Sequence, residues 1–199
     1  MSDTSAPMHP RQRKPDTAAD PGSLTHEEYV ELQLRRSKLK ADADCAFRAT
    51  HLLDLLRNRI GVDAFASLRS ILCVGCRNRH ELDAAEAAGF SEVAGIDLHS
   101  LDPRISVMDM HAMSFQGGMF DVVLASHSLE HAKDPERAGA ELRRVTAPGG
   151  YLIIEVPIFY GTFDADLWAF RSPERVLALL GEVAPVLTLS LIHTWRCRP

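Results

Sequence analysis

The segment from residue 120 to residue 157 decides the fold: FDVVLASHSLEHAKDPERAGAELRRVTAPGGYLIIEVP. Its continuous apolar run at 122–125 is typical of a strand that is buried on both faces. Apolar residues then recur at helical spacing over 138–145. The Pro-Gly-Gly turn at 148–150 ends this helix, and a second β-rich run follows at 151–156. A strand, a helix and a strand in this order form a right-handed crossover in a parallel sheet.

A polar elbow, Ser-His-Ser-Leu-Glu-His at 126–131, joins the first of these strands to the helix. In open parallel sheets, ligands bind in the crevice outside the carboxyl ends of the strands. We therefore expect the residues that carry chemistry in this elbow.

The rest of the sequence places this segment in an α/β domain. Apolar runs at 71–74, 93–97 and 105–108 predict three further strands, and 81–88 predicts a helix. The expected fold class is α/β, with a doubly wound, mostly parallel sheet. We expect four parts along the chain: a disordered tail at 1–22, an N-terminal helical cover at 23–61, the α/β domain at 62–188 and a doubtful tail at 189–199.

The region before the first strand has the pattern of two helices. Thr25 and Glu28 form a capping box, in which each side chain bonds the backbone N–H of the other residue. A second apolar face runs from Phe47 to Ile60, and Gly61 ends it. These helices either cover the sheet or form a lid over a substrate cleft, and the sequence leaves both alternatives open.

Composition and charge argue against several function classes. The 199 residues carry a formal net charge of −5, so we expect no nucleic-acid partner. No apolar run approaches the roughly 20 residues that cross a bilayer, so we expect no membrane contact and a cytoplasmic protein. The four cysteines are expected to be free thiols. Cys73-x-x-Cys76 lacks further ligands at the spacing of a zinc site, so no metal is expected.

A glycine turn and an acidic residue mark a ligand site. Gly75 lies between the strand at 71–74 and the helix at 81–88, where backbone N–H groups can face an anionic group. Asp97 ends the next strand, 22 residues after Gly75. A carboxylate at this place can accept hydrogen bonds from both hydroxyls of a ribose. These features suggest an adenosine-containing ligand, the alternative being that Asp97 is an acid in a solvated turn.

From Leu68 to Pro157 the chain resembles the class I S-adenosylmethionine-dependent methyltransferases that act on small molecules. The resemblance rests on the order and spacing of the glycine turn, the strand-end acid, Phe120-Asp121-Val122-Val123, Leu129-Glu130-His131 and the Pro-Gly-Gly turn. It implies a Rossmann-like methyltransferase fold, S-adenosyl-L-methionine as cofactor and a small-molecule methyl acceptor. The cofactor-binding residues that it implies are Gly75, Arg77, Asp97, Leu98, Asp109, Met110 and Ser126.

The resemblance also implies which part of the cofactor several of these residues contact. The turn at Gly75 would hold the methionine part, Asp97 the ribose and Asp109 the adenine amino group, with the backbone of Met110 alongside. A dinucleotide dehydrogenase is the nearest rival, but the sequence after Gly75 fails its glycine pattern at two positions. We therefore expect methyl transfer to a small molecule rather than hydride transfer.

The glycine turn departs from the family pattern, because arginines stand at positions 77 and 79 where the family usually has glycines. Glycine allows a positive φ and the close approach of a ligand. Arg77 or Arg79 either takes over the contact with the cofactor carboxylate or fills the site and weakens binding. The alternative function is therefore a non-catalytic methyltransferase-like scaffold that no longer binds cofactor.

His131 and Glu130 in the elbow are the candidates for catalysis. A histidine there can take a proton from an oxygen or nitrogen acceptor during methyl transfer. The competing interpretation is that Leu129-Glu130-His131 only caps and packs the elbow. His111, after the third strand, is expected in a surface loop. The aromatic residues between Tyr160 and Phe170 either line an acceptor pocket or close the core.

The C-terminal end has less sequence than the family's last two strands would need. Residues 183–192 can supply one strand, and we expect the last strands of the sheet to be missing. The segment at 189–199 resembles a translated sequencing-adapter end, and we hypothesise that it is not native. The alternative is a genuine sixth strand with a basic tail. A missing hairpin would leave one sheet edge open and lower the solubility.

Overall fold

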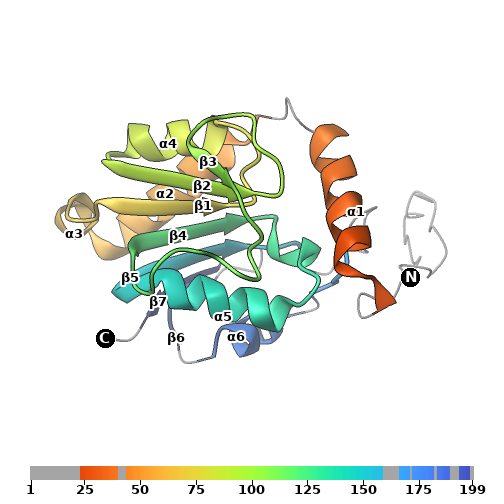
Figure 1. Cartoon of the computed structure of the whole chain (residues 1–199). Coiled ribbons are helices and arrows are strands. Elements are labelled where there is room, and N and C mark those ends of the chain that lie inside the picture. Colours follow the sequence, from red (N-terminus) through yellow and green to blue (C-terminus); the bar gives the residue numbers. More distant parts are fainter. Residues whose placement is uncertain are drawn as a thin grey trace, which may run out of the picture.

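The computed structural model describes residues 23–39, 44–158, 166–170, 172–181, 183–188 and 193–197. The tail at 1–22 lies outside these residues, as do Tyr160 and Phe163 of the aromatic cluster. The described residues form an α/β fold in which one sheet lies between two layers of helices, as the sequence predicts (Figure 1).

The strands are β1 Ser70–Val74, β2 Glu92–Asp97, β3 Ile105–Val107, β4 Phe120–Ser126, β5 Thr146–Glu155, β6 Val183–Thr188 and β7 His193–Cys197. They form one sheet in the order β3-β2-β1-β4-β5-β7-β6. The first five strands are parallel to their neighbours among themselves. The chain places β2 on one side of β1 and β4 on the other, so the strand order reverses at β1. Ligands of doubly wound sheets bind at such a point.

The C-terminal strands differ from the expectation. β7 lies between β5 and β6 and is antiparallel to both, so the expectation that the last strands are missing is wrong. β6 ends at Thr188 and β7 begins at His193, inside the segment assigned to the doubtful tail. Antiparallel strands need only a short connection, so the chain is long enough for both. The hypothesis about the origin of residues 189–199 stays a prediction.

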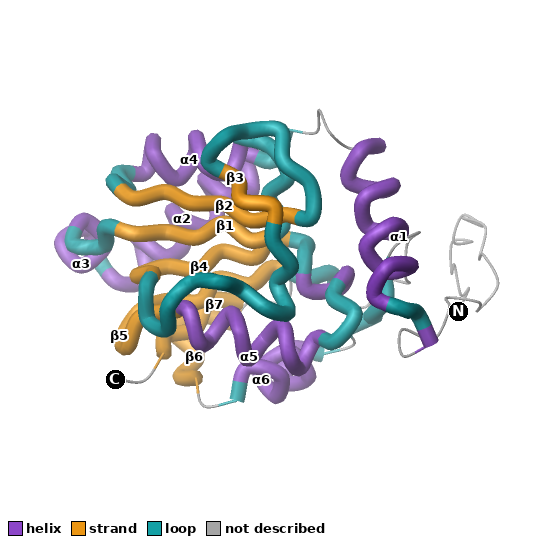
Figure 2. The backbone as a smooth tube through the Cα atoms, viewed as in Figure 1, coloured by secondary structure: helices purple, strands orange, loops and turns teal. Residues whose placement is uncertain are grey.

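The helices are α1 His26–Leu39, α2 Ala46–Ile60, α3 Val62–Ala66, α4 His80–Ala88, the short 3-10 helix η2 Leu129–His131, α5 Pro135–Val145 and α6 Pro173–Leu180. Helices α2 and α4 cover one face of the sheet, and α5 and α6 cover the other (Figure 1). Helix α1 stands apart from both layers, beyond the carboxyl ends of the strands (Figure 2). None of the helices in the described ranges is long and apolar enough to span a membrane.

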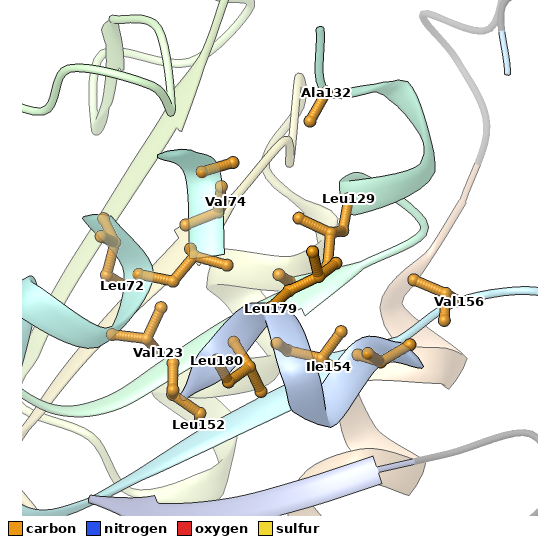
Figure 3. Close-up of a cluster of buried hydrophobic side chains, with 14 of the residues drawn as sticks. Leu72, Val74, Val123, Leu129, Ala132, Leu152, Ile154, Val156, Leu179 and Leu180 are labelled. Carbon is orange, nitrogen blue, oxygen red and sulfur yellow. The ribbon is translucent and has the colours of Figure 1, made fainter. Parts of the chain in front are cut away.

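The buried side chains form two clusters, because successive side chains of a strand point to opposite faces of the sheet. Leu72 and Val74 of β1 belong to the cluster that includes α5 and α6, whereas Ile71 and Cys73 belong to the cluster that includes α2 and α4. Figure 3 shows the first cluster, where Leu180 of α6 lies among side chains of the strands. With both faces buried, the carboxyl edge of the sheet remains for ligands.

Caps define where the helices near this edge begin. The backbone N–H of Thr25 donates to Glu28 Oε2 at 2.7 Å, and the Glu28 N–H donates to Thr25 Oγ1 at 3.2 Å, which confirms the capping box. Asp134 caps α5 by accepting from the Arg137 backbone N–H at 2.9 Å. Helix α5 therefore begins directly after the elbow.

Candidate active site

A cavity of about 440 Å³ lies at the carboxyl edge of the sheet. One wall consists of the segments that follow β1, β2, β3 and β4, and the opposite wall consists of α1 and the start of α2. The sequence left two alternatives for the N-terminal helices, a cover on the sheet or a lid over a cleft, and each alternative applies to a different helix. Helix α2 packs on the sheet, whereas α1 contributes Tyr29, Gln33 and Arg36 to the cavity.

The turn at Gly75 accepts no larger residue. Its φ is +78°, and a Cβ at this position would lie 2.6 Å from the Cβ of Ser128 in the elbow. Ser128 Oγ donates to the Val74 carbonyl at 2.9 Å, and the Gly75 N–H donates to the Ile96 carbonyl at 2.8 Å. The turn is therefore fixed to the elbow on one side and to β2 on the other.

The two arginines of the turn occupy different surroundings. Arg77 has a φ of +41°, so its backbone adopts the left-handed conformation that glycine favours, and Arg77 lines the cavity. Arg79 has a side chain that is 69% exposed and whose Nε lies 3.5 Å from Asp83 Oδ2. Among the described residues Arg79 is not part of the cavity wall. Of the two arginines of the turn, Arg77 is therefore the one that can contact or obstruct a ligand in the cavity.

Asp97 lies at the end of β2 and faces the cavity. Its Oδ2 accepts from the Arg77 N–H at 3.1 Å and its Oδ1 accepts from the His99 N–H at 3.0 Å. Burial raises the pKa of Asp97, while the hydrogen bond from His99 and the charge of Arg77 oppose this rise. Each carboxylate oxygen has a second lone pair, so both can still accept a hydroxyl proton.

Asp109 follows β3 and is held by His111. Asp109 Oδ1 accepts from the His111 N–H at 2.9 Å and lies 2.5 Å from His111 Nδ1. The Asp134 N–H donates to His111 Nε2 at 3.1 Å, so the ring proton belongs on Nδ1. Burial acts to raise the pKa of Asp109, but the hydrogen bonds from His111 outweigh it and lower the pKa.

His111 is 8% exposed, so the expectation of a surface loop residue is wrong. Tyr29 of α1 packs edge-on against its ring, with the ring centroids 5.5 Å apart. Burial, followed by the charge of Asp109, raises the pKa of Tyr29. His111 therefore connects Asp109, the cap of α5 and helix α1.

The elbow separates the two catalytic candidates. Glu130 is 2% exposed, and its Oε1 lies 3.0 Å from Nδ1 of His127 rather than beside His131. His127 has a φ of +51°, and its N–H donates to the Glu155 carbonyl at 2.8 Å. Both Glu130 and His131 belong to the cavity wall. The structure thus brings both candidates to the cavity but gives them different partners.

His131 is paired with a residue from much later in the chain. Its Nδ1 lies 3.2 Å from Oδ1 of Asp166, and Arg36 Nη1 of α1 lies 3.0 Å from the same oxygen. The Asp166 side chain is 5% exposed, against 17% for His131 and 19% for Arg36. A buried carboxylate therefore lies between the elbow and α1.

Residues 72–154 match the methyltransferase domain family. This span includes the glycine turn, both strand-end carboxylates and the elbow, and it lies in a sheet whose last strand is antiparallel and inserted between its neighbours. The described part of the chain has the Rossmann-like fold of methyltransferases. The matched span runs from β1 to β5, and the segments that follow the first four of these strands form one wall of the cavity.

Two curated relatives illustrate the similarity of this chain to known methyltransferases. An uncharacterized methyltransferase from Mycolicibacterium gilvum (strain PYR-GCK) is 38% identical over 71 residues, which cover 32% of this chain and 28% of that protein. The ubiquinone biosynthesis O-methyltransferase of Bordetella avium (strain 197N) is 28% identical over 161 residues, 70% of this chain and 64% of that protein. The chain therefore spans less than two thirds of the length of these relatives.

Among solved structures, the 1,6-didemethyltoxoflavin-N1-methyltransferase of Burkholderia thailandensis superimposes with a TM-score of 0.56. That structure contains bound 1,6-didemethyltoxoflavin and S-adenosylhomocysteine. The two chains are 16% identical, and the alignment covers 87% of each. At this identity the likeness concerns the fold of the methyltransferase domain.

The remaining predicted cofactor residues divide into two groups. Leu98 and Met110 line the cavity beside Asp97 and Asp109. Ser126 does not occur among the described residues of the cavity wall, and its hydroxyl donates to Glu155 Oε2 at 2.6 Å. Of the predicted cofactor residues, Ser126 is the one that the structure does not bring to the cavity.

The described aromatic residues after β5 close the core of the methyltransferase domain. Phe170 is 2% exposed, and Trp168 packs against the same core and donates from Nε1 to the Ala132 carbonyl at 2.7 Å. Cys73 and Cys76 are buried free thiols. No group of three potential metal ligands exists among the residues that the structure describes.

Sequence reasoning missed four residues of the site: Tyr29, Arg36, His111 as a partner of Asp109, and Asp166. Arg36 and Asp166 are 130 positions apart, so no local pattern could connect them. For Tyr29, the sequence pattern of α1 alone does not indicate which face of the helix meets the cavity. For His111, the spacing Asp-x-His after a strand was the available signal, since such a histidine can reach back to the carboxylate.

Proposed function

We propose that this chain transfers the methyl group of S-adenosyl-L-methionine to a small-molecule acceptor. The observation that carries the proposal is the single cavity wall on which Gly75, Asp97 and Asp109 lie in order at the ends of β1, β2 and β3. In the same order, the turn at Gly75 would bind the carboxylate of the cofactor, Asp97 its ribose and Asp109 its adenine. This arrangement favours the enzyme over the scaffold alternative.

The residues of the wall fit the cofactor. Asp97 would accept from the ribose hydroxyls, and Asp109, whose Oδ1 is occupied by His111, would accept from the adenine amino group. Leu98 and Met110 supply apolar surface beside them. Only glycine fits at position 75, because its φ is positive and a Cβ would meet Ser128, and the backbone of this turn would face the methionine part. Arg77 would bind the cofactor carboxylate.

His131 is the proposed base. When bound, S-adenosyl-L-methionine supplies a methyl group on a positively charged sulfur. The protein positions the acceptor and removes its proton. His131 lies on the cavity wall with Nδ1 directed to Asp166, so its other nitrogen can take a proton from the acceptor. Glu130 remains part of the proposed site through its contact with His127.

We propose residues 23–61 and 62–188 as the N-terminal cover and the methyltransferase domain, acting as one unit because the cavity uses both. The named relatives support a small-molecule acceptor: one acts in ubiquinone biosynthesis as an O-methyltransferase, and another is an N1-methyltransferase with its small substrate bound. Neither nucleic acid nor a membrane is proposed as a partner, and the cytoplasm is the proposed location.

Equilibrium dialysis with S-adenosyl-L-methionine labelled in the methyl group tests this function. We expect saturable binding that S-adenosylhomocysteine displaces and NAD does not. Labelled product should then form from at least one member of a panel of phenols, carboxylic acids and amines. Absence of saturable binding would instead support the non-catalytic scaffold.

A further inference from the structure

Asp166 is held rigidly against the elbow. The N–H groups of the next two residues, Leu167 and Trp168, both donate to the Glu130 carbonyl, at 2.9 and 3.1 Å. The Trp168 ring donates to the Ala132 carbonyl at 2.7 Å. This segment follows β5 in the chain but packs as part of the elbow, so the position of Asp166 is fixed relative to His131.

The Asp166 carboxylate is buried and charge-paired. Its Oδ1 lies 3.2 Å from His131 Nδ1 and 3.0 Å from Arg36 Nη1, and only 5% of the side chain is exposed. A buried carboxylate is stable only with such partners. Asp166 itself is absent from the described cavity wall, whereas both of its partners belong to it.

We propose that Asp166 is a positioning residue, which holds His131 with the ring proton on Nδ1 and directs Nε2 to the methyl acceptor. This inference rests on the proposed function, since it assigns the orientation of the base in the same site. Arg36 of α1 contacts the same Asp166 oxygen, so we expect Asp166 to orient the His131 ring when α1 is packed against the cavity.

The arrangement accounts for each proton and electron pair of the step. The O–H or N–H bond of the acceptor breaks, and its proton goes to Nε2 of His131. The freed electron pair of the acceptor forms the bond to the methyl carbon, and the carbon–sulfur bond breaks with its electrons remaining on sulfur. Asp166 accepts the Nδ1–H throughout and stabilises the imidazolium that forms, as in hydrolase triads.

Nitrogen-15 NMR of the His131 ring tests the inference on the full chain saturated with S-adenosylhomocysteine. In the wild type we expect the proton on Nδ1. In Asp166→Ala we expect it to move to Nε2, the form that a histidine without this partner favours. The matched control is Asp54→Ala, which removes the exposed partner of Arg57 in α2 and should leave the His131 signals unchanged. Calorimetric affinity for S-adenosylhomocysteine should be the same in all three proteins.

Asp166→Asn keeps the shape and provides a second measurement if the alanine variant does not fold. The amide oxygen still accepts from Nδ1–H but more weakly than a carboxylate, so the Nδ1 proton resonance should move upfield. A wild-type proton on Nε2, or signals that neither substitution changes, would overturn the inference. Failure of the wild type to bind S-adenosylhomocysteine would instead contradict the proposed function, and the ring signals remain readable in that case.

Discussion

Arg77 shows how a residue with a side chain can take the place of a glycine in the turn after β1. Its φ of +41° is in the left-handed region that glycine favours, and its N–H donates to Asp97. For a residue with a Cβ, this left-handed backbone conformation costs roughly 1 kcal/mol or more in free energy. The departure from the glycine pattern therefore changes the side chain at the cavity without changing the course of the backbone.

Two substitutions at this position separate the backbone from the side chain. Arg77→Gly and Arg77→Ala both remove the guanidinium, but only glycine adopts a positive φ without strain. We expect the glycine variant to be more stable than the alanine variant by about 1 kcal/mol in urea denaturation. An alanine variant of equal or greater stability would contradict the left-handed turn.

Glu81 on α4 is a buried acid whose Oε2 has no hydrogen-bond partner among the described residues. Burial raises its pKa from 4.5 to about 8. Between these two values the folded chain holds a proton that the unfolded chain has lost. Stability should therefore fall as the pH rises through this window.

Glu81→Gln replaces the neutral acid with a neutral amide of the same shape. We expect the variant to match the wild type near pH 5 and to exceed its unfolding free energy by roughly 2–4 kcal/mol at pH 9, since one pKa unit corresponds to about 1.36 kcal/mol. Thermal unfolding across this pH range measures the difference, with Glu92→Gln at an exposed position as the control. A difference independent of pH would mean that Glu81 titrates normally.

At the scale of elements, α1 is attached to the remainder of the fold by few contacts. Tyr29 packs on His111, Arg36 pairs with Asp166, and the Leu24 carbonyl before the helix accepts from Lys133. Helix α2, by contrast, contributes fully buried leucines to a core cluster. Helix α1 should therefore open more easily than the elements of the sheet.

Removing the Tyr29 ring should release α1 selectively. In Tyr29→Ala we expect faster hydrogen exchange of the amides at 26–39, with no change in β1 and β4, because the ring is the buried aromatic anchor of this helix. Val30→Ala, at a half-buried position in the outer groove of α1, is the matched control. Equal acceleration in α1 and the sheet would show that the helix does not open independently.

The sequence predicts elements better than it predicts their partners. The runs at 71–74 and 122–125 identify strands because burial on both faces requires continuous apolar residues, and Asp97 is recognisable because it ends such a run. The partners of His131 and Glu130 are not predictable in this way. Asp166 reaches His131 only through the packing of a segment that follows β5, which leaves no periodic pattern.

At the scale of the whole molecule, β7 completes the sheet. It pairs with β5 over four residues and with β6 on its other side. Apolar periodicity could not reveal it, because β7 reads His-Thr-Trp-Arg-Cys and because its role depends on two neighbours that are already in place. The sheet would otherwise end at an open β5 edge.

Deletion of residues 193–199 should therefore destabilise the entire domain. Each backbone hydrogen bond contributes about 1 kcal/mol net, and both ladders of β7 would be lost, so we expect a loss of several kcal/mol and aggregation through the β5 edge. Thermal unfolding and light scattering measure both effects. An unchanged unfolding midpoint would show that β7 does not contribute to stability.

Binding of S-adenosylhomocysteine by calorimetric titration tests the central claim most directly. Asp97 lies on the cavity wall, whereas Asp63 on α3 is exposed outside it, so Asp63→Ala is the matched control for Asp97→Ala. We expect one binding site in the wild type and in the control, and an affinity at least about tenfold lower in Asp97→Ala, which corresponds to 1.4 kcal/mol. No heat of binding and no thermal stabilisation in the wild type, or equal affinity in Asp97→Ala, would contradict the account.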